Sequence, residues 1–417
     1  MKNKLIHISG TMSKYLMPLF IVIFGFYSCK EYSPFDPTGG MPEVYYVRLP
    51  DIEKADSLID GAFLETSICL VGNNLRSVYE LYFNDQKATL NTNFITDNTL
   101  VVAVPSNVPY DVTDQMYLIT RNNDVVTFPF KSKVPSPAVN SMKCEYVADG
   151  DIAEINGNYF IDDPNIPLTI TMAGNIPVER EDILSIDVNK LVFKVPAGSQ
   201  KGYINVSSIY GTGRSHFQFR DDRGIILDWD ALRGAGWRAG NLASADGISG
   251  NYVVFKGDLT GSWSEDDFSF NLWGEPGGRP QGDFFDATKI VDKAGNSKLL
   301  FKFEINILAP WTRDAMQIVF TSWATANTNG YYSDDQYPRA LWIPWATTGS
   351  YMTEGWTTVT IPMADFKFSP TGRILELNKD GNYGGLSMFI WNSGGIESSR
   401  DCTTEMWLDN IRVVPVD

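Results

Sequence analysis

The sequence is poor in the residues that build metal sites and nucleophilic catalytic sites. Among its 417 residues only two are histidines, His7 and His216, and only four are cysteines, with no CxxC pair among them. Zinc clusters and Ser-His-Asp triads need several such side chains close together. We therefore expect neither kind of site in this chain.

Basic residues are also scarce. The chain has 34 Lys and Arg residues against 50 Asp and Glu residues, which leaves a formal net charge of −16. Recognition of the phosphate backbone depends on clustered Lys and Arg, so we do not expect binding to nucleic acid. The 43% share of hydrophobic residues is nevertheless that of an ordinary globular chain. At roughly 100–200 residues per domain, the length predicts about two to four domains.

The first residues have the pattern of a secretion signal. Three lysines, Lys2, Lys4 and Lys14, precede the apolar run Leu16–Phe26. Ser28 and Cys29 follow this run. This run is too short for a membrane-spanning helix, which needs roughly 20 residues. The position of Cys29 resembles the lipobox of bacterial lipoproteins, which implies that residues 1–28 are removed and that Cys29 is lipidated. The alternative is a plain signal peptide with an incidental cysteine.

Residues 29–41, rich in Pro and Gly, are typical of a tether. Beyond them the chain consists of short β-rich runs separated by Gly, Asn, Asp and Pro, and no helical period persists. This pattern predicts an all-β protein.

Two stretches of the chain repeat each other. Gly157-Asn158 follows Gly72-Asn73 by 85 residues, and Val195-Pro196 follows Val104-Pro105 by 91 residues. We expect each Gly-Asn pair to turn the chain at a positive φ, and each proline to end a strand because it cannot donate to a ladder. The repeat therefore predicts two β-modules of similar size.

This repeat resembles the IPT/TIG immunoglobulin-like fold over residues 42–133 and 134–220. The resemblance implies two tandem β-sandwiches that act as spacers or interaction surfaces. We expect His216, beside Phe217, to be an ordinary strand residue. Cys69 and Cys144 are expected to be small buried hydrophobic residues.

The composition changes after residue 220. All 11 tryptophans lie beyond this point, and a core of this size rarely needs so many, so some should be exposed for a function. Four of them are expected to fill a second core layer under loops: Trp229, Trp237, Trp356 and Trp407.

Alternation along the strands separates the other tryptophans from the core. Trp273 falls on the face of Ser269 and Asn271, opposite Phe268 and Phe270. By the same rule Trp323 shares a face with Gln317 and Thr321. Trp342 is expected to point outward, opposite Leu341 and Ile343.

A polar face is also expected along residues 299–307, and a polar aromatic loop along 327–338. Sugar rings stack their C–H faces on aromatic planes, and their hydroxyl groups need amides and charged groups around them. These features predict a sugar-binding surface. Its candidate residues are Trp273, Trp323, Trp342, Trp345, Tyr331, Tyr332, Gln317, Lys302, Glu304 and Asn306. The alternative is that the tryptophans form a second core layer under loops.

The whole order of signal, paired IPT modules and Trp-rich β-domain resembles the surface glycan-binding proteins of Bacteroidota polysaccharide utilisation loci. Its most specific stretches are Trp342-Ile-Pro-Trp345, Gly355–Pro362 and Trp407–Ile411. The resemblance implies a jelly-roll-like sandwich at 221–417 after the two immunoglobulin-like sandwiches. It also implies a non-catalytic lipoprotein, in the position of SusE or SusF, on the extracellular side of the outer membrane. Such a protein would hold a plant or microbial β-glycan for a surface glycosidase and a SusC/SusD-like transporter.

Two other classes of function stay open at this stage. The IPT modules could serve a surface adhesin or a protein-binding scaffold. A glycoside hydrolase would need two carboxylates about 5–5.5 Å or 6.5–9.5 Å apart, and the sequence alone does not exclude such a pair.

No cofactor is expected from the sequence. Residues 378–389 superficially match a calcium-binding EF-hand loop, but Tyr383 takes the glycine position and Phe389 the position of the bidentate Glu. A structural calcium ion of the kind that jelly-roll modules hold, with Asp409 as a ligand, remains a possibility.

Overall fold

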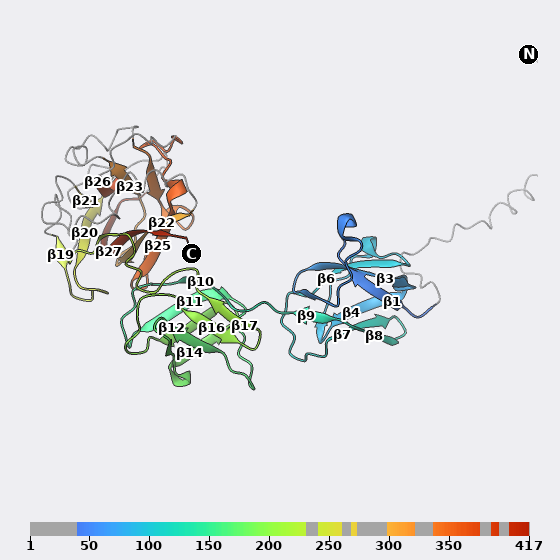
Figure 1. Ribbon diagram of the computed structural model, residues 1–417. Helices are drawn as coiled ribbons and strands as arrows, with labels where there is room; N and C mark the ends of the chain where they lie inside the picture. Colours follow the sequence, from blue (N-terminus) through green and yellow to red (C-terminus); the bar gives the residue numbers. More distant parts are fainter. Residues whose placement is uncertain are drawn as a thin grey trace, which may run out of the picture. The chain divides into compact units, whose positions relative to one another are not determined.

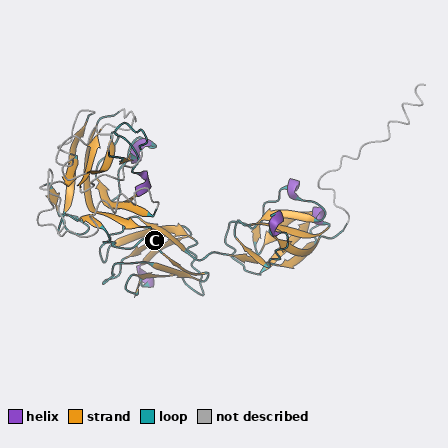
Figure 2. Cartoon of the chain, turned by 45° about the horizontal axis from the view of Figure 1, so that its top comes forward, coloured by secondary structure: helices purple, strands orange, loops and turns teal. Residues whose placement is uncertain are grey.

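The computed structural model describes residues 40–230, 241–260, 268–272, 298–321, 337–375, 385–391 and 400–416. Apart from short 3-10 helices, the regular structure in these residues consists of β-strands (Figure 2). The prediction of an all-β fold is thus confirmed. None of the described helices is long and apolar enough to cross a membrane. The chain forms two compact units, Met1–Val134 and Pro135–Asp417.

The first unit contains three sheets, in the strand orders β1-β3-β6, β5-β4-β7-β8 and β2-β9. Its buried side chains include Leu70, Leu81 and Leu118, all with no exposed surface. The strands are β1 (Glu43–Arg48), β2 (Gly61–Phe63), β3 (Ser67–Asn73), β4 (Val78–Phe83), β5 (Gln86–Lys87), β6 (Thr99–Ala103), β7 (Gln115–Thr120), β8 (Val125–Pro129) and β9 (Lys131–Lys133). Three 3-10 helices lie at Ile52–Lys54, Leu75–Ser77 and Thr92–Phe94.

The second unit begins with a sandwich of two four-stranded sheets, β10-β11-β15-β14 and β13-β12-β16-β17, which we call module 2 (Figure 1). Ile155, Ile170 and Val206 are fully buried in its core. Its strands are β10 (Ala138–Met142), β11 (Ile152–Asn158), β12 (Thr169–Met172), β13 (Ile176–Pro177), β14 (Ile183–Asp187), β15 (Lys190–Lys194), β16 (Asn205–Ser208) and β17 (Gly211–Arg214), with a 3-10 helix at Arg180–Asp182.

The sequence repeat corresponds to a repeat in the structure. Gly72 on β3 and Gly157 on β11 occupy equivalent positions. Each lies beside a bulge in the strand with which it pairs, β1 for Gly72 and β10 for Gly157. In the same way β3 pairs with β6 and β11 pairs with β15. The prolines Pro105 and Pro196 come just after β6 and β15.

The structure requires glycine at positions 72 and 157 for a reason other than the expected positive φ. A Cβ atom at either glycine would lie 1.9 Å from a carbonyl oxygen of the opposing strand, that of Glu43 or of Ala138. Glycine is therefore required by close approach of the two backbones. The positive φ comes two residues later in each copy, 54° at Asn74 and 60° at Tyr159.

The rest of the second unit is a larger sandwich, the C-terminal module. Its large sheet has the order β19-β20-β27-β22-β25, with β18 also paired to β27, and its small sheet has the order β21-β26-β23-β24. The strands are β18 (Ile225–Leu227), β19 (Leu242–Ala243), β20 (Tyr252–Leu259), β21 (Ser269–Leu272), β22 (Leu299–Ile307), β23 (Ala315–Thr321), β24 (Arg339–Trp342), β25 (Thr357–Pro362), β26 (Gly385–Trp391) and β27 (Cys402–Pro415). Two 3-10 helices lie at Pro344–Ala346 and Met363–Asp365.

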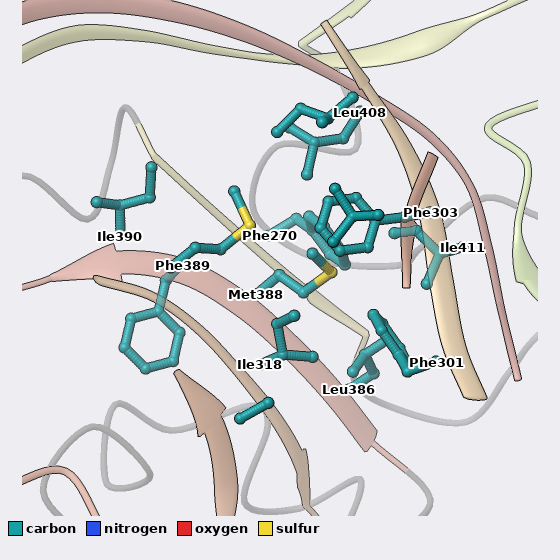
Figure 3. Close-up of a cluster of buried hydrophobic side chains, with 14 of the residues drawn as sticks. Phe270, Phe301, Phe303, Ile318, Leu386, Met388, Phe389, Ile390, Leu408 and Ile411 are labelled. Carbon is teal, nitrogen blue, oxygen red and sulfur yellow. The ribbon is translucent and has the colours of Figure 1, made fainter. Parts of the chain in front are cut away.

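The core of the C-terminal module lies between its two sheets. Phe301 and Phe303 of β22 and Leu408 of β27 belong to the same buried cluster as Ile318 and Met388 of the small sheet (Figure 3). Trp229 and Trp311 are fully buried in the same cluster. Trp345, with an exposed fraction of 6%, belongs to this cluster as well. Burial under the surface is what the sequence predicts for Trp229.

Strand β27 contains a bulge at Asn410, whose φ is 48°. Arg412 pairs with Lys302 and Asp409 pairs with Glu304, so two residues of β27 stand opposite one residue of β22. Such an extra residue reverses the alternation of side chains along the rest of the strand. As a result Arg412 points away from the core, toward module 2.

Candidate functional site

The polar face predicted along β22 is present, but it is not exposed. Lys302, Glu304 and Asn306 have exposed fractions of 4%, 0% and 7%. Lys302 Nζ lies 2.6 Å from Oε1 of Glu145, which belongs to module 2. The expectation that these residues face solvent is therefore wrong. Module 2 packs against this outer face of the large sheet at Lys302, whereas Asn306 accepts a hydrogen bond from Thr353 of the C-terminal module. Alternation along one strand reveals which residues share a face but not what covers that face.

Two acidic and two basic side chains form a buried cluster here. Besides Lys302, the cluster contains Arg412, whose Nη2 lies 2.8 Å from Glu145 Oε2 and whose Nη1 lies 2.7 Å from Glu304 Oε2. Thr358 of β25 donates to Glu304 Oε1 over 2.9 Å. We call Glu145, Lys302, Glu304 and Arg412 the junction cluster.

The charges of the junction cluster balance, which is the condition for keeping ions in a protein interior. Burial opposes the charge on Arg412, but the attraction of Glu304 and Glu145 outweighs it and raises the pKa of the guanidinium further. Burial raises the pKa of Glu304, although Arg412 opposes this shift. The cluster therefore joins the two modules, and it leaves no free charge for a ligand.

The outer face of the small sheet is the second polar surface of the C-terminal module. Ser269 pairs with Phe389 and Phe389 pairs with Gln317, so these residues share a face, opposite Phe270 and Met388. The alternation predicted for β21 and β23 is thus correct. Arg339 Nη1 donates to Gln317 Oε1 over 2.7 Å on the same face.

The polar side chains of this face are buried. We call Ser269, Gln317, Thr321, Arg339 and Ser387 the polar strip; each has an exposed fraction of 1% or less. Within the described part of the chain, the hydroxyl groups of Ser269 and Ser387 have no hydrogen-bond partner. Hydroxyl groups without a partner are rare in a protein interior, because leaving them unpaired costs free energy. Trp391, half-buried, ends β26.

The two tryptophans predicted on this face, Trp273 and Trp323, lie outside the described residues. The strands that lead to them end at the same level of the sheet, because Leu386 of β26 is the partner of both Leu272 and Phe320. The chain therefore leaves the sheet toward both tryptophans on either side of a single strand. Tyr331 and Tyr332 also lie outside the described residues.

Trp342 lies on the face opposite to the predicted one. It pairs with Met316, whose side chain is in the core, and its ring packs 5.8 Å from that of Phe303 and 5.5 Å from that of Trp311. The outward positions of β24 belong instead to Arg339 and Leu341. The prediction failed because Leu341 and Ile343 look more suitable for a core than a tryptophan does.

Trp342 is half-buried. Trp342 lines a groove of 340 Å³ together with Thr360 and Pro362 of β25 and with Phe368. Trp345 is 94% buried, since its exposed fraction is 6%, and its indole N–H donates to the carbonyl oxygen of Asp314 over 3.0 Å. Trp345 therefore has a structural partner in the described part of the chain.

Sequence reasoning missed an aromatic cluster on the outer face of the large sheet. The ring of Tyr252 stacks on that of Trp407 at 4.8 Å and meets that of Trp356 edge-on at 5.4 Å. Trp356 and Trp407 are half-buried and pack outside the main core between the two sheets. Alternation along the strand does predict the outward position of Trp407, because this residue lies between the buried Met406 and Leu408.

Asp409, considered as a calcium ligand, is fully buried. It accepts hydrogen bonds from Ser249 Oγ at 2.7 Å and from the backbone N–H of Asn410 at 2.8 Å. Burial raises the pKa of Asp409 to about 8, although these two bonds oppose the shift. Among the described residues, no three His, Cys, Asp or Glu side chains gather in a metal-binding group. The contacts of Asp409 are hydrogen bonds within the protein.

Comparisons with known proteins identify relatives of the chain. The family described as "Surface glycan-binding protein B xyloglucan binding domain" matches residues 219–415. The crystal structure of the surface glycan-binding protein PbSGBP-B from Prevotella bryantii is similar with a TM-score of 0.73 and 32% identity, over 91% of this chain and 99% of that chain. An IPT/TIG domain-containing protein of Bacteroides ovatus is 21% identical over 363 residues, which is 76% of this chain and 71% of that protein.

Proposed function

This chain belongs to the family of B-type surface glycan-binding proteins, and from that membership we propose that its C-terminal module binds xyloglucan or another β-glucan of similar backbone. Proteins of this family bind glycans and are not hydrolases, so the chain is a non-catalytic binding protein. The matched region, residues 219–415, covers the whole described C-terminal module. The choice of glycan follows from the description of that region in the family, where it is a xyloglucan-binding domain.

One observation supports our proposal that the site lies on the outer face of the small sheet. The strands β21 and β23, which lead to Trp273 and Trp323, end at the same level, with Leu386 as their common partner. They are separated by β26 alone, so their ends lie about two strand spacings, or roughly 10 Å, apart. Trp273 follows β21 by one residue and Trp323 follows β23 by two residues in the sequence, which favours a shared site for the two side chains. The polar strip beneath supports this region of the sheet.

The described residues divide into direct and indirect roles under this proposal. Trp273, Trp323, Tyr331 and Tyr332 are the proposed stacking residues. Gln317 is buried beside Arg339, and its proposed role is to hold the sheet under them. Trp342 and Trp345 would contribute through the edge groove and through the core beneath it. The burial of Lys302, Glu304 and Asn306 favours a structural role for these three over contact with the glycan.

Binding to a panel of polysaccharides tests the proposal. Affinity gels that contain xyloglucan, mixed-linkage glucan, mannan, xylan or an α-glucan should retard the purified chain only where the backbone is a β-glucan. Trp273→Ala and Trp323→Ala should each weaken binding by about 1–3 kcal/mol, by analogy with stacking of nucleic acid bases on aromatic side chains. The matched control is Tyr110→Ala, because Tyr110 is 97% exposed and lies in the first unit. A chain that none of the β-glucan gels retards would refute the proposal.

The location and the partners of the protein form the second part of the proposal. Membership of a surface glycan-binding family supports a cell-surface location. We propose that a lipid on Cys29 anchors the chain to the extracellular side of the outer membrane, with residues 29–41 as a tether. The bound glycan would pass to a surface glycosidase and a SusC/SusD-like transporter of the same locus. Cys29 lies outside the described residues.

A further inference from the structure

A cleft of 520 Å³ lies within the second unit, where module 2 meets the C-terminal module. Module 2 contributes residues of the stretch 143–154, among them Ala148 and Ile152. The C-terminal module contributes the turn at residues 246–248 and the stretch 354–356, which ends in Trp356. The volume falls within the range of about 300–1,000 Å³ that is typical of small-ligand sites. More than half of the lining residues come from module 2, outside the region that matches the family at residues 219–415.

The two walls of the cleft are held in a fixed relation. The junction cluster lies next to the cleft, because Cys144 lines the cleft and Glu145 is the next residue in the sequence. Tyr146 Oη also donates to the carbonyl oxygen of Asp221 over 2.6 Å, and the backbone N–H of Glu145 donates to Thr358 Oγ1 over 2.8 Å. The walls of the cleft are therefore already ordered, so that binding of a ligand would cost little conformational entropy in the protein.

Trp356 supplies an aromatic surface at the cleft. Its indole N–H donates to the backbone carbonyl of Asp246 over 3.0 Å, and Tyr252 and Trp407 pack against its ring at 5.4 Å and 6.1 Å. These contacts fix the plane of the ring, and yet the side chain remains half-exposed. An aromatic ring held in one orientation and partly open to solvent is suited to stack on the apolar face of a sugar.

The charges around the cleft define which sugars could bind. Asp151, Glu154, Asp246 and Glu354 line it, against the single cation Lys143. Carboxylates accept hydrogen bonds from hydroxyl groups, whereas their negative charge repels anionic sugars such as uronates. The lining therefore fits a neutral, hydroxyl-rich ligand.

We propose that this cleft is a second glycan-binding site, which takes a neutral oligosaccharide segment and stacks one of its rings on Trp356. The inference rests on the proposed function, because it assumes that the same class of neutral β-glucan reaches both sites. The cleft adjoins the large sheet, and the first site lies on the outer face of the small sheet. The two sites thus occupy opposite sides of the C-terminal module, and one protein could hold two chains or two segments of one chain.

Isothermal titration of the full mature chain with a short xyloglucan oligosaccharide tests this inference. The wild type should bind two oligosaccharides per chain. Ala148→Trp should block the cleft with little effect on folding, because Ala148 is exposed, and should leave one site with unchanged affinity. Trp356→Ala should weaken binding at the cleft by about 5- to 150-fold. The matched control is Ala55→Trp, which adds the same ring to an exposed position of the first unit.

Each outcome of the titration has a distinct meaning. If the wild type binds one oligosaccharide, Trp273→Ala abolishes binding and Ala148→Trp changes nothing, the second site is refuted and the proposed function stands. If the wild type binds no neutral glucan, both proposals are refuted. Residual binding in Trp273→Ala that disappears on adding Ala148→Trp would establish the cleft as a site. Tighter binding of polygalacturonate than of neutral oligosaccharides at the cleft would overturn the inferred ligand class.

Discussion

Glu145 of module 2 and Arg412 of the C-terminal module form a buried ion pair, with 2.8 Å between Oε2 and Nη2. The two residues are separated by 267 positions in the chain. Arg412 can reach Glu145 only because the bulge at Asn410 turns it away from the core. One residue in a left-handed conformation thus places Arg412 in the contact between the two modules.

The first prediction concerns the loss of Glu145. Glu145→Ala should destabilise the second unit by about 3–5 kcal/mol, because it leaves the charge of Lys302 buried without its carboxylate partner and deprives Arg412 of one of its two carboxylates. Differential scanning calorimetry of the full chain should show a lower transition temperature for that unit alone. The control is Glu80→Ala in the first unit, where Glu80 pairs with the exposed Lys87 over 2.5 Å. Removing a surface pair of that kind should change stability far less, because solvent screens the attraction between its charges. Equal effects of the two substitutions would contradict the role given to the junction cluster.

The second prediction concerns where the chain can be divided. A fragment of residues 135–417 should be more stable than a fragment of residues 221–417, because the second lacks Glu145 and leaves Arg412 without one of its two carboxylates. Chemical denaturation of both fragments, followed by tryptophan fluorescence, measures the difference. Identical midpoints for the two fragments would show that module 2 does not stabilise the C-terminal module.

Three features were predictable from the sequence: the all-β fold, the repeat of Gly72 and Gly157, and the shared face of Ser269 and Gln317. These features depend on alternation and turn residues, which are local properties of a strand. The burial of Glu304 was not predictable in this way, because its partners Glu145 and Arg412 lie far away in the sequence. The face of Trp342 was misassigned because the hydrophobicity of its neighbours does not decide which side of a short strand meets the other sheet.

The third prediction separates a core tryptophan from a stacking one. Trp342→Ala should lower the thermal midpoint, because truncation of a large aromatic side chain in a core costs about 3–5 kcal/mol, and the half-buried Trp342 should approach that range. Its ring contacts with Phe303 and Trp311 would be lost. Trp273→Ala should leave the midpoint nearly unchanged and weaken glycan binding. The reverse pattern in paired melting and affinity measurements would contradict our assignment of faces.

The fourth prediction concerns the anchor. Cys29→Ala should abolish metabolic labelling with a fatty acid and release the protein from the outer-membrane fraction, because it removes the thiol to which the proposed lipid is attached. Cys402→Ala serves as the control, since Cys402 is a free cysteine in β27 and should not affect labelling. Labelling that persists in Cys29→Ala would exclude lipidation at this position.

The last prediction concerns the pH dependence of stability at Asp409. Burial raises its pKa from the ordinary value of 3.8 to about 8 in the folded protein. Between these two values the folded state keeps a proton that the unfolded state has lost, so this residue makes stability fall as the pH rises. The slope is up to about 1.4 kcal/mol per pH unit for one proton.

Asp409→Asn should remove this contribution. An asparagine is neutral at every pH, and it can still accept from the backbone N–H of Asn410 and donate to Ser249 Oγ, which the carboxyl group contacts at 2.7 Å. Urea unfolding at pH 5, 6, 7 and 8 should therefore show a steeper loss of stability in the wild type than in the variant, with the difference growing toward pH 8. Parallel curves would mean that Asp409 is ionised throughout this range. Its hydrogen bonds to Ser249 and Asn410 would then outweigh the cost of burying its charge.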